Sequence, residues 1–409
     1  MPGAFKKARN GCLRILLALS VVLGHLGAQY TLAGGFAAVQ LFFIISGFYM
    51  ETVLRGKYHP RRDIGLFYVS RALRIYSVYF TCLAVSAGVY GALYLKGEGL
   101  FAFVAANAER LGGYGQAWLA LASFGIFGQD VVLFQKIAEG QLVFNPHGNF
   151  GADPENALAW KFMAIPQAWT ISLELMFYLA APFLARLSTR ALTMIAAASF
   201  VARAVTYAAG YDGDPWIYRF FPFEIALFVY GMLARRFHDA FIHRIAVPAR
   251  RLAGLGFMAA CCLVQPLSDI LGVPVIFAVW PLYAASLIAL PCLFAEGGRL
   301  DSRLAELSFP VYLIHWIVIV AYGALGLPAT LRIPLCVAGA LGAGWAIVVL
   351  VERPVDRLRQ RMRVRSAPPV LPPTPRRAIE VMGGVAVRPA AAFLPNRVPP
   401  TRRPQPGVS

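Results

Sequence analysis

Long apolar stretches recur along this 409-residue chain, and short polar segments rich in arginine separate them. A helix needs about 20 predominantly apolar residues to cross a bilayer. Ten stretches approach that length, at residues 12–30, 36–54, 75–95, 165–187, 191–209, 217–234, 252–267, 273–295, 307–327 and 333–351, of which 252–267 is the shortest. The pattern predicts an all-α polytopic membrane protein, a bundle of about ten transmembrane helices.

Basic residues cluster in the connections between these stretches. The clusters lie at residues 6–14, 55–74, 186–190, 235–251, 299–303 and 353–361. When ten spans are counted, every cluster falls on one side of the membrane, and cytoplasmic loops carry the excess of Lys and Arg. We therefore expect the N- and C-termini to be cytoplasmic.

Residues 96–164 break the regular spacing of the spans. The segment is mostly polar and Gly-rich, but residues 117–134 are semi-apolar with Gln129 and Asp130 among them. We interpret it as an outside loop with an interfacial or re-entrant helix. An eleventh span over 117–134 is the alternative, and it would reverse the side of every later arginine cluster.

Composition supports a membrane protein followed by a basic tail. Hydrophobic residues make up 58% of the chain and charged residues 14%, against about 25% charged residues in soluble domains. From residue 357 onward the chain has eleven arginines and one acid, and from residue 366 it has eleven prolines. We predict one membrane domain, residues 1–355, and a disordered cytoplasmic tail, residues 356–409, because the tail has no apolar periodicity with which to bury a core.

The net charge of +18 invites a nucleic-acid function, which the distribution of charge excludes. The basic residues lie in loops beside apolar spans and in the tail, the pattern of contact with anionic membrane lipids. The six cysteines fall nearly all within apolar spans, without the spacing of metal ligands, and indicate packing residues. We expect neither a nucleic-acid partner nor a metal.

Arg14 and His25 lie within the first apolar stretch, where charged and titratable side chains are costly and usually functional. Eleven residues at ~100° each return both side chains to nearly one helix face, roughly 16 Å apart along the axis. We expect both to face the same interior. The alternative is that Arg14 reaches the lipid headgroups and His25 is a packing residue.

Other spans also hold polar groups, which must face one another or a watery cavity. Glu174 and Tyr178 are four residues apart and therefore share a helix face. Further polar residues in the spans include Gln40, Ser46, Ser172, Arg219, Glu224, Ser308, Tyr312 and His315. An interhelical hydrogen-bond network, at about 0.6 kcal/mol per bond, is the structural interpretation, and we favour it for Gln40, Ser46 and Ser172. Histidines, glutamates and arginines together in one bundle indicate a proton-handling or anion-binding cavity.

Six blocks in order resemble the integral-membrane acyltransferase-3 family. They are Arg14 and His25 with ten residues between them, VQLFFIISGF at 39–48, RALRIY at 71–76, WTISLELMFY at 169–178, SFPVYLIH at 308–315 and ERP at 352–354. The resemblance covers roughly residues 10–355. Gln40 stands where the family often has an acid, and Ser77 replaces a frequent proline.

The resemblance implies O-acyl transfer, chiefly in bacteria and therefore in the inner membrane. The donor is cytoplasmic acyl-CoA, by family acetyl-CoA, and the acceptor is a hydroxyl of an exported or lipid-linked saccharide such as exopolysaccharide or O-antigen. Because a hydroxyl must lose its proton, His25 is the expected base, with Glu174 and His315 as further catalytic candidates. We expect Arg14, Arg71 and Arg74 to bind the donor's phosphates. Plain positive-inside anchoring is the alternative for Arg71 and Arg74.

Two other classes of function remain open. A polytopic transporter or flippase of a saccharide or small anion would also hold charges within its helices, although the sequence has no inverted repeat and no matched pair of broken helices. A non-catalytic sensor or assembly factor is the third class. Expected partners are the saccharide or glycolipid acceptor, membrane lipids and polysaccharide-export machinery.

Overall fold

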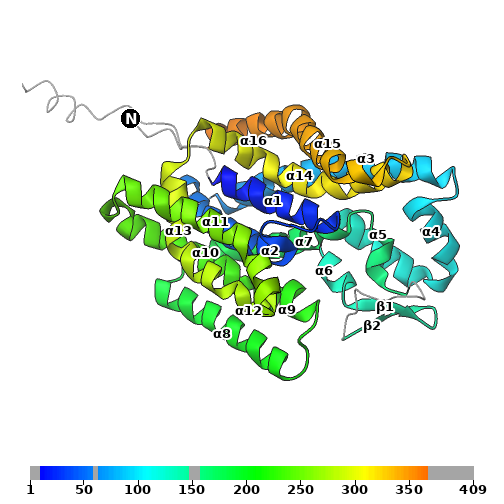
Figure 1. Ribbon diagram of the computed structural model, residues 1–409, viewed down its shortest axis with the longest axis horizontal. Coiled ribbons are helices and arrows are strands. Elements are labelled where there is room, and N and C mark those ends of the chain that lie inside the picture. The colour runs from blue at the N-terminus through cyan, green and yellow to red at the C-terminus, as the bar shows by residue number, and fades with distance from the viewer. Residues whose placement is uncertain (1–9, 59–62, 147–156, 367–409) are drawn as a thin grey trace, which may run out of the picture. The chain divides into compact units, whose positions relative to one another are not determined.

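The computed structural model describes residues 10–58, 63–146 and 157–366 (Figure 1). Within these residues the chain is almost entirely helical. The first part of the chain forms α1 (Gly11–His25), α2 (Gly34–Lys57), α3 (Ile64–Tyr94), α4 (Gly99–Asn107), α5 (Gly113–Gly125), α6 (Gln129–Val132), β1 (Gln135–Ala138) and β2 (Gln141–Phe144). The rest forms α7 (Trp169–Leu184), α8 (Thr189–Ala208), α9 (Trp216–Arg219), α10 (Phe221–Phe241), α11 (Val247–Leu271), α12 (Val275–Ala278), α13 (Trp280–Glu296), α14 (Arg299–Ala324), α15 (Arg332–Ile347) and α16 (Arg353–Ser366).

Eight helical segments of the described chain are long and apolar enough to cross a membrane. They are Gly34–Gly56, Ile64–Tyr94, Thr189–Ala208, Trp216–Arg244, Val247–Leu271, Val275–Glu296, Arg299–Ala324 and Ala329–Met362. The predicted fold class, an all-α polytopic membrane protein, is therefore confirmed.

The count of ten spans stays a prediction, because two of the ten are short helices. The predicted spans 12–30 and 165–187 contain α1, with 15 residues, and α7, with 16. At 1.5 Å per residue each is roughly 23 Å long, less than the ~30 Å hydrocarbon core. Asn10, with φ 67°, precedes the start of α1, and Gly27, also with φ 67°, follows its end.

Two glycines allow α2 and α10 to approach closely in the core of the bundle. A Cβ atom at Gly47 would lie 1.8 Å from the carbonyl oxygen of Phe228, and one at Gly231 would lie 1.9 Å from that of Ile44. No side chain fits at these distances, so the two backbones are in direct contact. On its other side α2 packs against α1, which in turn packs against α14 (Figure 1).

Residues 117–134 do not form an eleventh helical span. α5 has only 13 residues, and the chain turns at Gly128, with φ 87°, before the four-residue α6. A helix does lie in this segment, α5, but its interfacial or re-entrant position in an outside loop stays a prediction, and the hairpin of β1 and β2 was not predicted. The turn of the hairpin consists of Glu139 and Gly140, both with positive φ. Each strand has only four residues, too few for an alternating apolar pattern to be recognised in the sequence.

The last apolar span continues as a helix beyond the predicted domain boundary. After α15 come a π-helical turn, Val348–Glu352, and then α16, which extends to Ser366. The boundary at residue 355 stays a prediction, and the remainder of the predicted tail, residues 367–409, lies outside the described residues.

Candidate functional site

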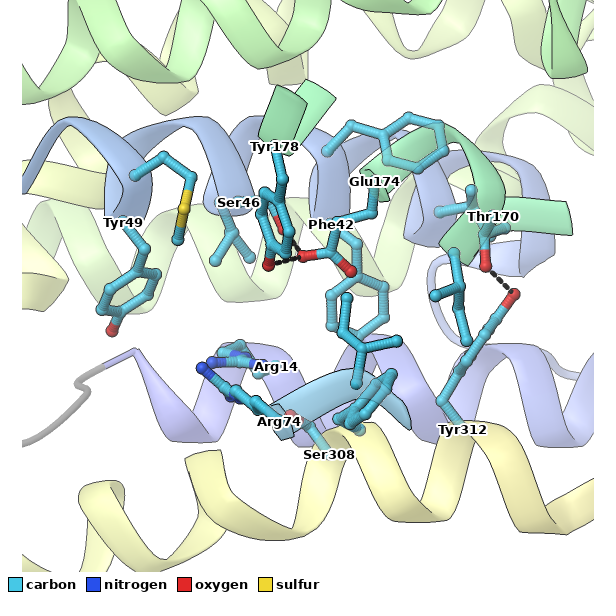
Figure 2. A pocket seen from close by; sticks show the side chains of 17 residues that line it. Arg14, Phe42, Ser46, Tyr49, Arg74, Thr170, Glu174, Tyr178, Ser308 and Tyr312 are labelled. Atoms are coloured by element: carbon cyan, nitrogen blue, oxygen red, sulfur yellow. Dashed lines mark hydrogen bonds between the residues drawn. The ribbon is translucent and has the colours of Figure 1, made fainter. Parts of the chain in front are cut away.

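A cavity of about 100 Å³ lies among α1, α2, α3, α7 and α14. One water needs roughly 10–15 Å³ by this measure, so the cavity has room for several waters or a small polar group. Figure 2 shows polar side chains projecting into it from opposite walls. They include Arg14, Ser46, Tyr49, Arg74, Thr170, Glu174, Tyr178, Ser308 and Tyr312.

Two guanidinium groups line this cavity, and among the described residues no oxygen accepts a hydrogen bond from either; Arg14 lies over the ring of Tyr49, 5.8 Å from its centroid. Arg14 comes from α1 and Arg74 from α3, and the two charges act on each other electrostatically. Within the described residues neither has a hydrogen-bond acceptor or an ion pair, and the Nε atom of Arg14 is buried. Because an unpaired cation out of water is costly, the pair favours an anionic ligand.

Glu174 lies across the cavity from the arginines (Figure 2). Its Oε1 atom accepts hydrogen bonds from Ser46 Oγ, at 2.9 Å, and from the Tyr178 hydroxyl one turn later on α7. The predicted shared face of Glu174 and Tyr178 is confirmed. Both hydrogen bonds fix the carboxylate in place, and its charge compensates only part of the arginine pair.

The two histidines meet outside the cavity. His25 is the last residue of α1 and is exposed, whereas His315 on α14 is completely buried. The Nδ1 atom of His25 lies 3.0 Å from the Nε2 atom of His315. The Nδ1 atom of His315 lies 2.6 Å from the carbonyl oxygen of Tyr312, which only accepts, so this nitrogen is the donor.

This arrangement determines where the protons lie when both rings are neutral. His315 carries its proton on Nδ1, so its Nε2 accepts a hydrogen bond from His25 Nδ1–H. The assignment follows from the partners of each nitrogen. The nitrogen of His25 that carries a lone pair is then Nε2. A general base needs such an unprotonated nitrogen to accept a proton.

Aromatic side chains separate the histidines from the cavity. Tyr312 lines the cavity, and its ring centroid lies 6.0 Å from that of His315 and 6.2 Å from that of Phe42. The Tyr312 hydroxyl is held by Thr170 Oγ1 at 2.9 Å. Arg14 therefore faces the cavity as expected, but His25 does not line it. The difference arises because side chains from α2 and α14 fill the space beside α1, which the spacing of the two residues on α1 does not reveal.

A family model for an acyltransferase domain, that of acyltransferase-3, matches residues 11–351, from the start of α1 into the turn after α15. The chain belongs to the acyltransferase-3 family. It is thus an integral-membrane acyltransferase, as the six sequence blocks indicated. No curated protein and no solved structure gives a significant match.

Arg71, in the RALRIY block of this acyltransferase, is buried outside the cavity. Its guanidinium lies over the rings of Phe67 and Tyr178, at 5.8 Å and 5.9 Å from their centroids. Only 6% of Arg71 is exposed, and within the described chain no oxygen accepts a hydrogen bond from it. Of the three predicted donor-binding arginines, the structure thus brings Arg14 and Arg74 into the cavity and leaves Arg71 behind Tyr178.

The structure adds Arg219 and Asp214 to the surroundings of His25. Arg219 donates from Nε and Nη2 to the two carboxylate oxygens of Asp214, at 2.6 Å and 2.7 Å. Its guanidinium also lies 4.5 Å from the ring centroid of Trp169, and it acts electrostatically on His25. From the sequence, Arg219 was recognisable as a charged residue within a predicted span. No pattern in the sequence indicated that it lies near His25.

A buried polar cluster connects α2, α8 and α10 away from the histidines. Gln40 Nε2 donates to both carboxylate oxygens of Glu224, at 3.1 Å and 3.3 Å, and Arg203 pairs with the same carboxylate. The interhelical role predicted for Gln40 is confirmed. Ser46 on α2 also bonds between helices, to Glu174 on α7 in the cavity, and Ser172 on α7 donates to Asp130 on α6 at 2.6 Å.

Proposed function

We propose that this acyltransferase moves an acetyl group from cytoplasmic acetyl-CoA to a hydroxyl of an exported or lipid-linked saccharide in the bacterial inner membrane. One observation carries the proposal: the Nδ1 atom of exposed His25 lies 3.0 Å from the Nε2 atom of buried His315, and no hydrogen bond to His25 Nε2 is made by the residues that the structure describes. A nearby cavity with two arginines that form no ion pair within the described residues supports an anionic donor.

His25 acts as the general base in the proposed reaction. Its Nε2 atom takes the proton of the acceptor hydroxyl while the hydroxyl oxygen attacks the carbonyl carbon of the thioester. When the tetrahedral intermediate collapses, the carbon–sulfur bond breaks, and the thiolate takes the proton from His25. The products are the O-acetyl ester and free CoA.

His315 is a positioning residue in this scheme. It is buried and fixed by the Tyr312 carbonyl, so the hydrogen bond to His25 holds the imidazole of His25 in one orientation and one tautomer. Arg219 acts electrostatically on His25 and therefore also on negative charge that develops on a carbonyl oxygen beside it.

Arg14 and Arg74 bind phosphate groups of the donor in the proposed complex, because guanidinium pairs with phosphate through two parallel hydrogen bonds. Arg14 and His25 are eleven residues apart on α1, roughly 16 Å. The extended pantetheine arm of CoA spans a distance of that order. Glu174, opposite the arginines, acts on both of them electrostatically.

The acceptor saccharide approaches His25 from its exposed side. Trp316 meets the His25 ring edge-on, with centroids 5.6 Å apart, and the Asp214–Arg219 pair lies nearby. An aromatic face and a fixed charged pair together suit a sugar, which has an apolar ring face and many hydroxyls. Membrane lipids and polysaccharide-export machinery are the further partners we propose.

The test compares the O-acetyl content of cell-surface glycans by proton NMR. The strains are wild type, a gene deletion, and the deletion complemented with His25→Ala or with the exposed matched control His243→Ala at equal protein level. We expect the acetyl signal to be lost in the deletion, restored by His243→Ala and not restored by His25→Ala. Unchanged acetyl content in the deletion contradicts the glycan acceptor, and a loss of glycan export with acetylation intact favours a transporter.

A further inference from the structure

The helix α16 brings an additional arginine onto α3. The Nε atom of Arg359 donates a hydrogen bond to Ser70 Oγ at 3.0 Å, and its Nη1 atom pairs with Asp356 one turn earlier. The side chain is 13% exposed, so most of it is withdrawn from water. Arg359 lies beyond residues 11–351, the part of the chain that matches the family.

Ser70 is followed directly by Arg71, which has no hydrogen-bond acceptor among the residues that the structure describes. The Nε atom of Arg71 is buried, and the contacts described for its guanidinium are those with the Phe67 and Tyr178 rings. Aromatic rings attract a cation but do not satisfy its N–H donors. Arg71 is more than nine-tenths buried, yet within the described residues its N–H donors lack acceptors. It lies next in the chain to Ser70, the residue to which Arg359 is hydrogen-bonded.

The charges of this region do not balance within the described residues. Arg71 and Arg74 both act electrostatically on Arg359, and Asp356 is the carboxylate in contact with the group. Glu352 acts on Arg74 electrostatically at longer range, and no ion pair joins the two in the described part of the chain. Like charges brought together out of water destabilise the fold unless an anion joins them.

We propose that Arg71, Arg74 and Arg359 form a phosphate-binding site, and that Arg359 is a donor-binding residue. The inference rests on the proposed function, because the phosphate is assigned to the acyl-CoA donor. Three guanidinium groups supply planar pairs of donors that match phosphate oxygens. Arg74 also lines the cavity, and the ring of Tyr178 lies between Arg71 and Glu174, so the site adjoins the cavity in which the acyl arm would lie.

Binding of CoA to the purified full-length protein in neutral phosphatidylcholine nanodiscs tests the proposal. We expect Arg359→Gln to weaken CoA binding at least tenfold, because the variant loses a hydrogen bond between two charged groups. The matched control is Arg357→Gln, which removes the same charge from an exposed position two residues earlier on α16 and should change the affinity less than twofold. Arg359→Lys should give an intermediate loss, because lysine keeps the charge but not the paired donors.

A phospholipid headgroup also carries a phosphate. A second experiment therefore distinguishes a lipid from CoA as the ligand of the three arginines. The same variants are placed in nanodiscs that contain phosphatidylglycerol, and bound lipid is quantified after extraction. CoA binding lost in Arg359→Gln with lipid retention unchanged supports the donor site. Phosphatidylglycerol retention lost with CoA affinity unchanged overturns it.

Equal CoA affinity in wild type and Arg359→Gln also overturns the inference, whereas wild-type protein that binds no CoA refutes the proposed donor itself. If Arg359→Gln does not yield folded protein, CoA binding by Arg359→Lys and Ser70→Ala tests the inference instead. Ser70→Ala removes the hydroxyl that orients Arg359 and leaves every charge in place, so we expect severalfold weaker CoA binding. Wild-type affinity in both of these variants would contradict the assignment.

Discussion

The Nδ1 atom of exposed His25 and the Nε2 atom of buried His315 are 3.0 Å apart, although 290 positions separate the two residues in the chain. His315 is fixed by the backbone carbonyl of Tyr312, so the buried histidine determines which nitrogen of the exposed one is free. Such a partner is typical of general bases, in which a second group sets the tautomer of the imidazole.

Replacement of His315 by leucine should lower kcat about tenfold or more, with little change in KM, because His25 loses its orienting partner but stays in place. His25→Ala should lower kcat by about 10²–10⁴-fold, the usual contribution of a general base. The measurement is single-substrate kinetics of acetyl transfer with the purified protein. The pH profile of kcat should also shift in His315→Leu, a change that a purely structural role would not produce.

Arg14→Gln and Arg74→Gln should each raise the KM for the acyl donor roughly tenfold, because each removes a charged hydrogen bond to phosphate. Both side chains line the cavity, and in the described chain neither has a hydrogen-bond acceptor or an ion pair. Exposed Arg190→Gln removes one charge elsewhere and is the matched control. A KM for the donor that stays at the wild-type value in both cavity variants would place donor binding elsewhere.

Gly231→Ala should destabilise the bundle by about 1–3 kcal/mol or more, since the new methyl group overlaps the carbonyl oxygen of Ile44 on α2. The control is Gly256→Ala in α11, where a Cβ would meet nothing within 4 Å. Alanine there should stabilise the helix by up to about 1 kcal/mol. Thermal unfolding in detergent measures both, and a Gly231→Ala protein as stable as wild type would show that α2 and α10 separate easily.

Asp130→Asn should gain stability relative to wild type as the pH rises. Burial raises the pKa of the Asp130 carboxyl, while the hydrogen bond from Ser172 opposes the shift. The folded protein therefore holds this proton more tightly than the unfolded chain does, and wild type loses that stabilisation as the pH rises from about 4 through the raised pKa. Asparagine carries no such charge at any pH.

The measurement for Asp130 is the difference in unfolding temperature between variant and wild type, followed from about pH 4 to pH 7. Asp212→Asn, at an exposed position, is the matched control. A difference that moves in favour of wild type with rising pH would contradict the expected sign.

Several features of this protein follow from local sequence. The apolar stretches determine a polytopic helical membrane protein, because the bilayer requires both an apolar surface and internally satisfied backbone groups. Arg14 and His25 were recognisable as site candidates for the same reason, since lipid makes polar side chains within a span costly. The six blocks led to the acyltransferase-3 family, which the match over residues 11–351 confirms.

The tertiary structure decided which of these residues meet. Arg14 and Arg74 share a cavity, whereas His25 and His315 form a pair beyond the wall made by Phe42 and Tyr312. Helical spacing orders residues along one helix, but it carries no information about the side chains that other helices insert beside them. The tether of Arg359 to Ser70 depends in the same way on how the helices pack, because a contact between residues 289 positions apart exists only once the bundle has formed.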